Sequence, residues 1–168
     1  MGAVAKVALK FADAQLLIIG DGPLKYFNGL QELARRLGIA DKVIFHKGCD
    51  DTTVPLSVID VFCLPSLQEG LGLSIIEAMA MGVPVVASDV GGVSTLIKDK
   101  EYGLLVSPKD EQALAEALIK ILENPSMAEK MARLSKEAVG EGFTLDTMTE
   151  KVLNLYHDVI EKRDAQAK

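Results

Sequence analysis

The densest group of residues that could perform chemistry lies between Pro65 and Glu77. Two carboxylates, Glu69 and Glu77, bracket this segment, and two glycines, Gly70 and Gly72, stand between them. Glycine lets a backbone approach a ligand closely, and carboxylates accept hydrogen bonds from paired hydroxyl groups. Because ribose and other sugars present such hydroxyls, the segment indicates a site for a hydroxyl-rich ligand.

The same segment leaves an apolar strand, Val61–Leu64, and enters a helical pattern over Leu73–Met81. The first amides of a helix lack internal partners, and the helix dipole adds about 0.3–1 kcal/mol for an exposed anion. A diphosphate at this helix start, with a carboxylate on either side, suits a sugar nucleotide. An alternative remains: Ser74 and Glu77 also have capping-box spacing, in which Ser74 caps the helix, and Glu69 would then be a solvated loop acid.

The elements that must position these residues alternate between short apolar runs and helical patterns. Strands are expected at Leu16–Ile19, Val43–Phe45, Val61–Leu64, Val83–Ala87 and Gly103–Val106. Helices are expected at Leu24–Leu37, Val54–Ile59, Leu73–Met81, Ser94–Ile97, Asp110–Glu123, Met127–Val139 and Leu145–Lys162. This alternation predicts an α/β fold, a Rossmann-like parallel sheet of about five strands flanked by helices, with a helical C-terminus. Ligands of such sheets bind beyond the carboxyl ends of the strands, where Pro65–Glu77 falls.

We expect residues 1–144 to form a nucleotide-sugar-binding domain and residues 145–168 to form a C-terminal helix and tail, with Arg163–Lys168 frayed. The 168 residues carry a net charge of −6 and no Lys/Arg cluster, which argues against nucleic acid as a partner. Cys49 and Cys63 lack metal-ligand spacing, so no metal site is expected.

No apolar stretch reaches the roughly 20 residues that span a bilayer, and no signal peptide is evident. A cytoplasmic location is expected, and peripheral attachment of a full-length parent to the inner face of the membrane stays open.

The run from Pro65 to Ser88 resembles the signature of family-four (group 1) retaining glycosyltransferases, which have the GT-B fold. The E-x7-E motif of this family matches Glu69 and Glu77. Further matches follow in order along nearly the whole chain, from about Ala5 to Ile160: Gly20-Asp21-Gly22-Pro23, Phe45 with Gly48, Asp60-Val61-Phe62, Gly91-Gly92 and Gly103-Leu104-Leu105-Val106. The resemblance implies transfer of a sugar from a nucleotide-diphosphate donor with retention of configuration. It also implies that no cofactor and no active-site metal take part, and that the donor substrate is a UDP- or GDP-sugar.

The resemblance also implies a role for each matching residue. Glu69 is similar to the glutamate beside the donor sugar and the anomeric centre, and is the catalytic candidate. Glu77 is similar to the glutamate that binds the ribose hydroxyls. The remaining donor-binding candidates are the loop and helix-start residues Gly70, Leu71, Gly72, Leu73 and Ser74, and the base-side residues Gly22, Gly48 and Cys49.

The chain also departs from the family pattern. The family's donor domain opens with a strand ending in Gly-Arg and a loop that bears a Lys. The positive charges of this Arg and Lys neutralise the departing diphosphate. This chain begins at Met1 within the helix that follows, and it lacks the N-terminal acceptor domain. We therefore expect a truncated domain that binds donor weakly and transfers little by itself. Ser94-Thr95 stands where many members have Pro-Glu, so a contact from that glutamate is not carried over.

In the family, the absent strand lies between Leu16–Ile19 and Val61–Leu64. Without it, the facing edges would leave unpaired backbone groups, so we expect the gap to close or to be filled by another segment or chain. Self-association is expected through this gap or through an apolar face of the C-terminal helix. That face carries Val152, Leu155, Tyr156 and Val159.

Two other functions compete with transfer. A dinucleotide-binding oxidoreductase needs G-x-G-x-x-G after its first strand, and the run Gly20–Lys25 lacks the third glycine. A non-catalytic nucleotide-sugar-binding or interaction module of the same fold stays open. The sequence does not determine the sugar, the base or the acceptor.

Overall fold

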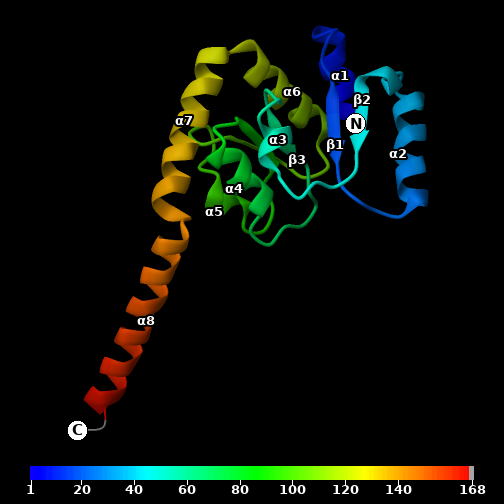
Figure 1. Ribbon diagram of the computed structural model, residues 1–168. Coiled ribbons are helices and arrows are strands. Elements are labelled where there is room, and N and C mark those ends of the chain that lie inside the picture. The colour runs from blue at the N-terminus through cyan, green and yellow to red at the C-terminus, as the bar shows by residue number, and fades with distance from the viewer. Residues whose placement is uncertain (167–168) are drawn as a thin grey trace.

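The computed structural model describes residues 1–166, and the side chains of residues 1–163. Its first half contains α1 (Gly2–Lys10), β1 (Leu16–Ile19), α2 (Leu24–Arg36), the short 3₁₀ helix η1 (Ala40–Lys42), β2 (Val43–His46), α3 (Thr53–Leu56) and β3 (Phe62–Leu64). Its second half contains α4 (Leu73–Ala80), β4 (Val85–Ser88), α5 (Val93–Leu96), β5 (Leu104–Val106), α6 (Glu111–Glu123), α7 (Pro125–Gly142) and α8 (Leu145–Gln166). The five strands and the helices between them confirm the predicted α/β class with a helical C-terminus (Figure 1).

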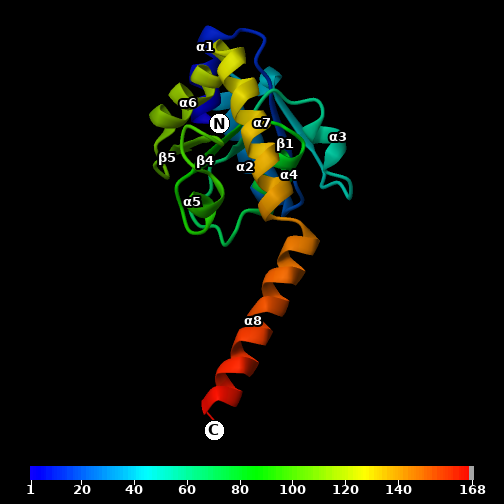
Figure 2. The same ribbon diagram turned by 90° about the vertical axis from the view of Figure 1, so that its left-hand side faces the viewer.

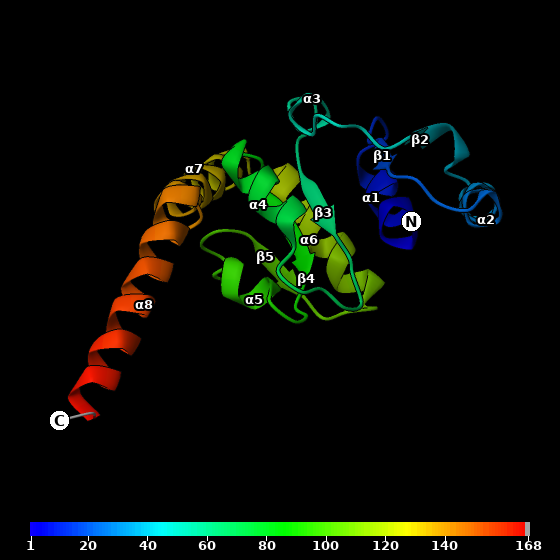
Figure 3. The same ribbon diagram turned by 60° about the horizontal axis from the view of Figure 1, so that its bottom comes forward.

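The strands are all parallel, but they form two sheets rather than one. β1 pairs with β2 from Leu16↔Val43 to Ile19↔His46, and the second sheet has the order β3-β4-β5. In the described residues no strand pairing joins the sheets, so the facing edges of β1 and β3 stay unpaired. The gap expected between these two strands is therefore present, and the chain does not close it. In Figure 3, β1, β2 and α2 lie to one side of β3, β4 and β5.

Helix α1 connects the two sheets through its side chains. Val7 packs into the core of the three-stranded sheet, in a cluster that also contains Val86, Leu104 and Leu118. Val4 and Ala5 pack instead against the cluster around β1 and β2. At the outer side of α1, Lys6 donates a hydrogen bond to Gln112 of α6 at 2.7 Å, and Lys10 pairs with Glu123. One helix thus holds both sheets although no strand bridges them.

Helix α4 is anchored by its buried face. Ile75, Ala78 and Met79 are fully buried in the cluster that also contains Val85 and Ala87 of β4. All four residues of β4 are buried, as expected for a parallel strand covered on both faces. This packing fixes the start of α4 at the carboxyl end of β3.

Helix α8 projects from the body of the molecule (Figures 1 and 2). Its first turn is capped by Thr144, whose hydroxyl accepts a hydrogen bond from the Thr147 amide at 3.1 Å. The helix continues to Gln166, beyond the expected end at Lys162, and residues 167–168 of the expected frayed tail lie outside the described part. Its large apolar side chains are exposed: Leu145, Met148, Val152, Leu153, Leu155, Tyr156, Val159 and Ile160.

Candidate functional site

The predicted helix begins at Leu73, and its N-cap is Gly72. Gly72 has φ 80° and ψ 60°, a left-handed conformation that glycine adopts without a Cβ clash. No side chain caps this helix. The capping-box interpretation of Ser74 and Glu77 is therefore wrong, because the helix starts two residues earlier than that motif requires and Ser74 lies inside its first turn.

The start of α4 leaves backbone donors open. The Ile75 and Ile76 amides donate to the Gly72 carbonyl, at 2.9 and 3.4 Å. The amides of Leu73 and Ser74 have no hydrogen bond among the described residues. These N–H groups, together with the helix dipole, make the start of α4 a place where an anion is stabilised.

The two carboxylates of the E-x7-E pair lie on either side of this start and differ in surroundings. Glu69 is half-buried, and the Ser66 hydroxyl donates a hydrogen bond to its Oε1 at 2.8 Å. Glu77 is exposed on the outer side of α4. Neither forms an ion pair among the described residues. Ser66 was not among the site residues predicted from the sequence; its signal there is a hydroxyl three positions before Glu69.

The loop that carries Glu69 is also held from the following turn. The amide of Gly92 donates to the Gly70 carbonyl at 2.9 Å. The sequence indicated Gly91-Gly92 only as a match to the family pattern, because this contact joins two loops that are far apart in the chain.

The base-side candidates belong to the other sheet. Gly22 and Gly48 are exposed and Cys49 is half-buried, in the loops after β1 and β2. These loops adjoin, since a Cβ on Gly48 would lie 2.6 Å from the Asp21 carboxylate. Hydrogen bonds from the Thr53 hydroxyl and amide lower the pKa of Asp51 in the second loop.

The loops that follow β1, β2 and β3 leave the carboxyl ends of both sheets on one side of the molecule, the lower side in Figure 1. No hydrogen bond or ion pair of the described residues joins Gly22, Gly48 or Cys49 to the α4 group. The structure therefore places the α4 group together, and it places the base-side group separately, on the β1–β2 sheet.

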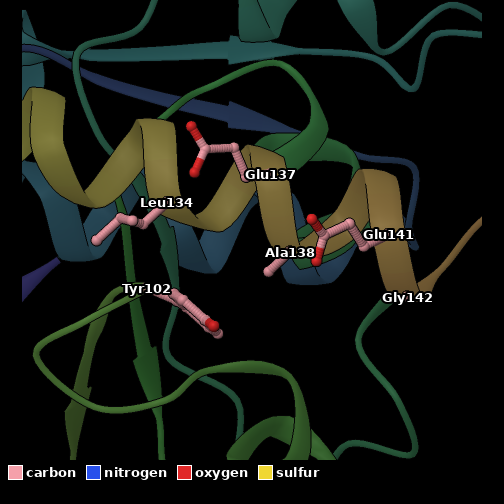
Figure 4. A pocket seen from close by; sticks show the side chains of 6 residues that line it. All are labelled: Tyr102, Leu134, Glu137, Ala138, Glu141 and Gly142. Atoms are coloured by element: carbon pink, nitrogen blue, oxygen red, sulfur yellow. The ribbon is translucent and has the colours of Figure 1, made fainter.

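Two hollows in the described part of the chain lie elsewhere. One, of about 370 Å³, is lined by Tyr102 and by α7 residues including Glu137 and Glu141 (Figure 4). The other, of about 290 Å³, lies at the amino ends of β3 and β4, near Asp60 and Pro84. Neither contains a predicted site residue.

Among the described residues, no group of three or more His, Cys, Asp and Glu side chains is placed to hold a metal ion. Within the same residues, none of the helices has the length and apolar character needed to cross a bilayer.

Comparison with known proteins relates this fold and site to one family. Residues 2–138 match the family described as "Glycosyl transferases group 1". The chain therefore belongs to the group 1 glycosyl transferase family, as its E-x7-E segment predicts.

Particular relatives support the same assignment. The chain is similar to the N-acetyl-alpha-D-glucosaminyl L-malate synthase of Bacillus anthracis, with 32% identity over 94% of this chain and 41% of that protein. It is similar in structure to sucrose-phosphate synthase from Thermosynechococcus elongatus, with a TM-score of 0.84, 30% identity, and coverage of 96% of this chain and 42% of that one. A TarM mutant from S. aureus, solved with UDP, Fondaparinux and alpha-GlcNAc-glycerol, matches with a TM-score of 0.83 and 26% identity over 92% of this chain and 31% of that one. The chain thus spans about two fifths of the length of the first two proteins.

Proposed function

We propose that this chain is the donor-binding domain of a retaining glycosyltransferase, and that its ligand is a nucleotide-diphosphate sugar. The observation that carries the proposal is the start of α4, where open amides lie between Glu69 and Glu77 at the carboxyl end of a parallel sheet. The family membership and the UDP in the related TarM structure support it.

The roles follow from the chemistry of each group. The amides of Gly72, Leu73 and Ser74 bind the diphosphate, with Gly70 and Leu71 forming the loop beside it. Glu77 accepts hydrogen bonds from the ribose hydroxyls, and Glu69 from the sugar hydroxyls next to the anomeric carbon. Gly22, Gly48 and Cys49 contact the nucleobase. We propose no cofactor and no metal for this site, so the transfer would rest on binding and on electrostatic stabilisation of the leaving diphosphate.

Calorimetric titration of the 168-residue chain tests the binding part of this proposal. The ligands are UDP-glucose, GDP-mannose and NAD, each over the same concentration range. Binding of a sugar nucleotide without binding of NAD is the expected result. Binding of NAD alone would overturn it in favour of a dinucleotide-binding domain.

Transfer itself is tested on a longer protein that joins this chain to an acceptor domain of the family. The anomeric configuration of the product, read by NMR, decides between retention and inversion. We expect the 168-residue chain alone to transfer little, because it spans about two fifths of the length of the transferases it resembles. Sugar-nucleotide binding without transfer by the longer protein would favour the alternative, a non-catalytic binding module.

We also propose that two copies associate through α8. Its exposed residues Leu145, Met148, Val152, Leu155 and Val159 recur at alternating spacings of three and four, the pattern of a coiled-coil seam. Light scattering should give a dimer for the wild type and a monomer for Leu155→Glu. The matched control is Leu153→Glu, which lies off the seam at similar exposure and should leave the dimer intact. A dimer that persists in Leu155→Glu would instead favour strand addition in the gap between β1 and β3.

A cytoplasmic location is proposed from the two unpaired thiols, Cys49 and Cys63, since reducing compartments keep thiols unpaired. Cell fractionation tests it, and recovery in a salt-washable membrane fraction would instead show peripheral attachment.

A further inference from the structure

The turn between β4 and α5, Asp89–Gly92, meets the Glu69 loop backbone against backbone. An ideal Cβ on Gly91 would lie 1.9 Å from the Glu69 carbonyl oxygen, and one on Gly92 would lie 2.1 Å from the Gly70 carbonyl oxygen. Real Cβ atoms do not approach other atoms within 3.0 Å. The two loops can adopt this packing because neither Gly91 nor Gly92 has a side chain.

This diglycine turn is itself held firmly in place. The Asp89 amide donates to the Val106 carbonyl of β5 at 2.8 Å. The Thr95 hydroxyl donates to the Gly92 carbonyl at 2.6 Å, and Val93, which follows the turn, is 1% exposed. Because β5 and α5 fix the turn, a side chain added at Gly91 or Gly92 must displace the Glu69 loop as well.

The size of that displacement follows from the distances. The Glu69 or Gly70 carbonyl would have to move by about 1 Å to restore an ordinary contact. The obstacle is backbone on both sides, so no side-chain rotation relieves it. A 1 Å misplacement of a group that contacts a reacting substrate can cost roughly 100-fold in rate.

We infer that Gly91 and Gly92 are positioning residues for Glu69. Their packing fixes the loop backbone on one side, and the Ser66 hydroxyl orients the Glu69 carboxylate on the other. The consequence for function rests on the proposed contact between Glu69 and the donor sugar. It predicts that Gly91 and Gly92 control recognition of the sugar more than recognition of the nucleotide.

The test uses four variants of the full chain, two at the turn and two matched controls. Gly91→Ala adds both a clash and a side chain at φ 52°, so its control is Gly38→Ala, at φ 69° with open space around the site. Gly92→Ala adds a clash without a positive φ, so its control is Gly140→Ala, which also meets nothing within 4 Å. If Gly91→Ala lowers the yield of folded protein, Gly92→Ala supplies the same test without the backbone strain.

Two readouts separate positioning from a general structural role. The first is the amide resonances of Ser66, Glu69 and Gly70 in the ¹⁵N-labelled chain. The second is the affinity for UDP-glucose relative to UDP, and for GDP-mannose relative to GDP. We expect both turn variants to shift the three resonances and to lower the sugar-nucleotide affinity about tenfold more than the nucleotide affinity, the size of one lost hydrogen bond to a charged group. The two controls should change neither readout.

The inference is overturned if the three resonances do not move, or if affinities for sugar nucleotide and nucleotide fall by the same factor. If the wild-type chain binds none of the four ligands, the proposed function fails. The positioning claim is then decided by the resonances alone: shifts at Ser66 and Glu69 support it, and their absence overturns it.

Discussion

The roles proposed for Glu69 and Glu77 predict a difference between two isosteric variants. Glu77→Gln should lower the affinities for UDP and for UDP-glucose by the same factor, because ribose is common to both ligands. Glu69→Gln should lower the affinity for UDP-glucose and leave the affinity for UDP unchanged, because the glucose is present in UDP-glucose alone.

The magnitudes follow from the surroundings of each carboxylate. A hydrogen bond to a charged group is worth about 1.5–3 kcal/mol, and the amide retains part of it, so a loss of about tenfold is expected for each variant. Glu77 is exposed and has no ion pair among the described residues. Its replacement should change stability by less than about 0.5 kcal/mol, which is a shift of about 2 °C or less in Tm for a chain of this size. In Glu69→Gln the amide oxygen can still accept the Ser66 hydroxyl, so the loop should keep its geometry.

Isothermal calorimetry of both variants against UDP and UDP-glucose, with GDP and GDP-mannose in parallel, measures the four affinities, and thermal denaturation measures Tm. If Glu69→Gln lowered the affinities for sugar nucleotide and for nucleotide by the same factor, the contact between Glu69 and the sugar would be refuted. An unchanged UDP affinity in Glu77→Gln, with GDP also unchanged, would refute the ribose contact.

Three further predictions concern the thiols, the cap of α4 and an independent helix. Burial raises the pKa of the Cys63 thiol to about 11, so only about one Cys63 thiol in a thousand is ionised at pH 8. At pH 8, iodoacetamide should therefore label Cys49, whereas it should label Cys63 only above about pH 10. Gly72→Ala and Gly82→Ala both place a side chain at positive φ, 80° and 72°. Each should cost about 1–2 kcal/mol of stability, measured by thermal denaturation. Only Gly72→Ala should also weaken UDP or GDP binding. Asp110 caps α6 by accepting the Ala113 amide at 2.8 Å; Asp110→Ala should cost about 1 kcal/mol, lowering Tm by about 2–4 °C without changing nucleotide affinity in calorimetry.

Most of the element boundaries could be predicted from the sequence because they depend on local patterns. β1 is observed at the predicted residues, Leu16–Ile19, and α4 and α8 begin where expected, at Leu73 and Leu145. Apolar runs ended by glycine or proline, and helical spacing of apolar residues, carry this information within a few positions of each boundary. The 3₁₀ helix at Ala40–Lys42 was missed because three residues hold too little pattern.

The order of the site residues along the chain is local information too. The E-x7-E spacing and the helix that follows it predict a donor site at Pro65–Glu77. The match of residues 2–138 to the group 1 glycosyl transferases agrees with the family that this segment resembles. The Ser-x-x-Glu spacing left a cap at Ser74 open as an alternative, but Gly72 takes the position. A left-handed glycine and a capping serine are both compatible with the same letters, so the local pattern does not decide between them.

The sequence by itself thus determined the strands, the helices and the two glutamates that bracket the start of α4, because each depends on neighbours in the chain. Only the tertiary structure decided that β1 and β3 stay unpaired with α1 spanning both sheets, and that Gly91 and Gly92 pack on the backbone of Glu69 and Gly70. These contacts join residues more than 20 positions apart, and the absence of a Cβ at such a contact has no local signature. Glycine looks the same in a sequence whether it permits a turn or makes room for another segment of backbone.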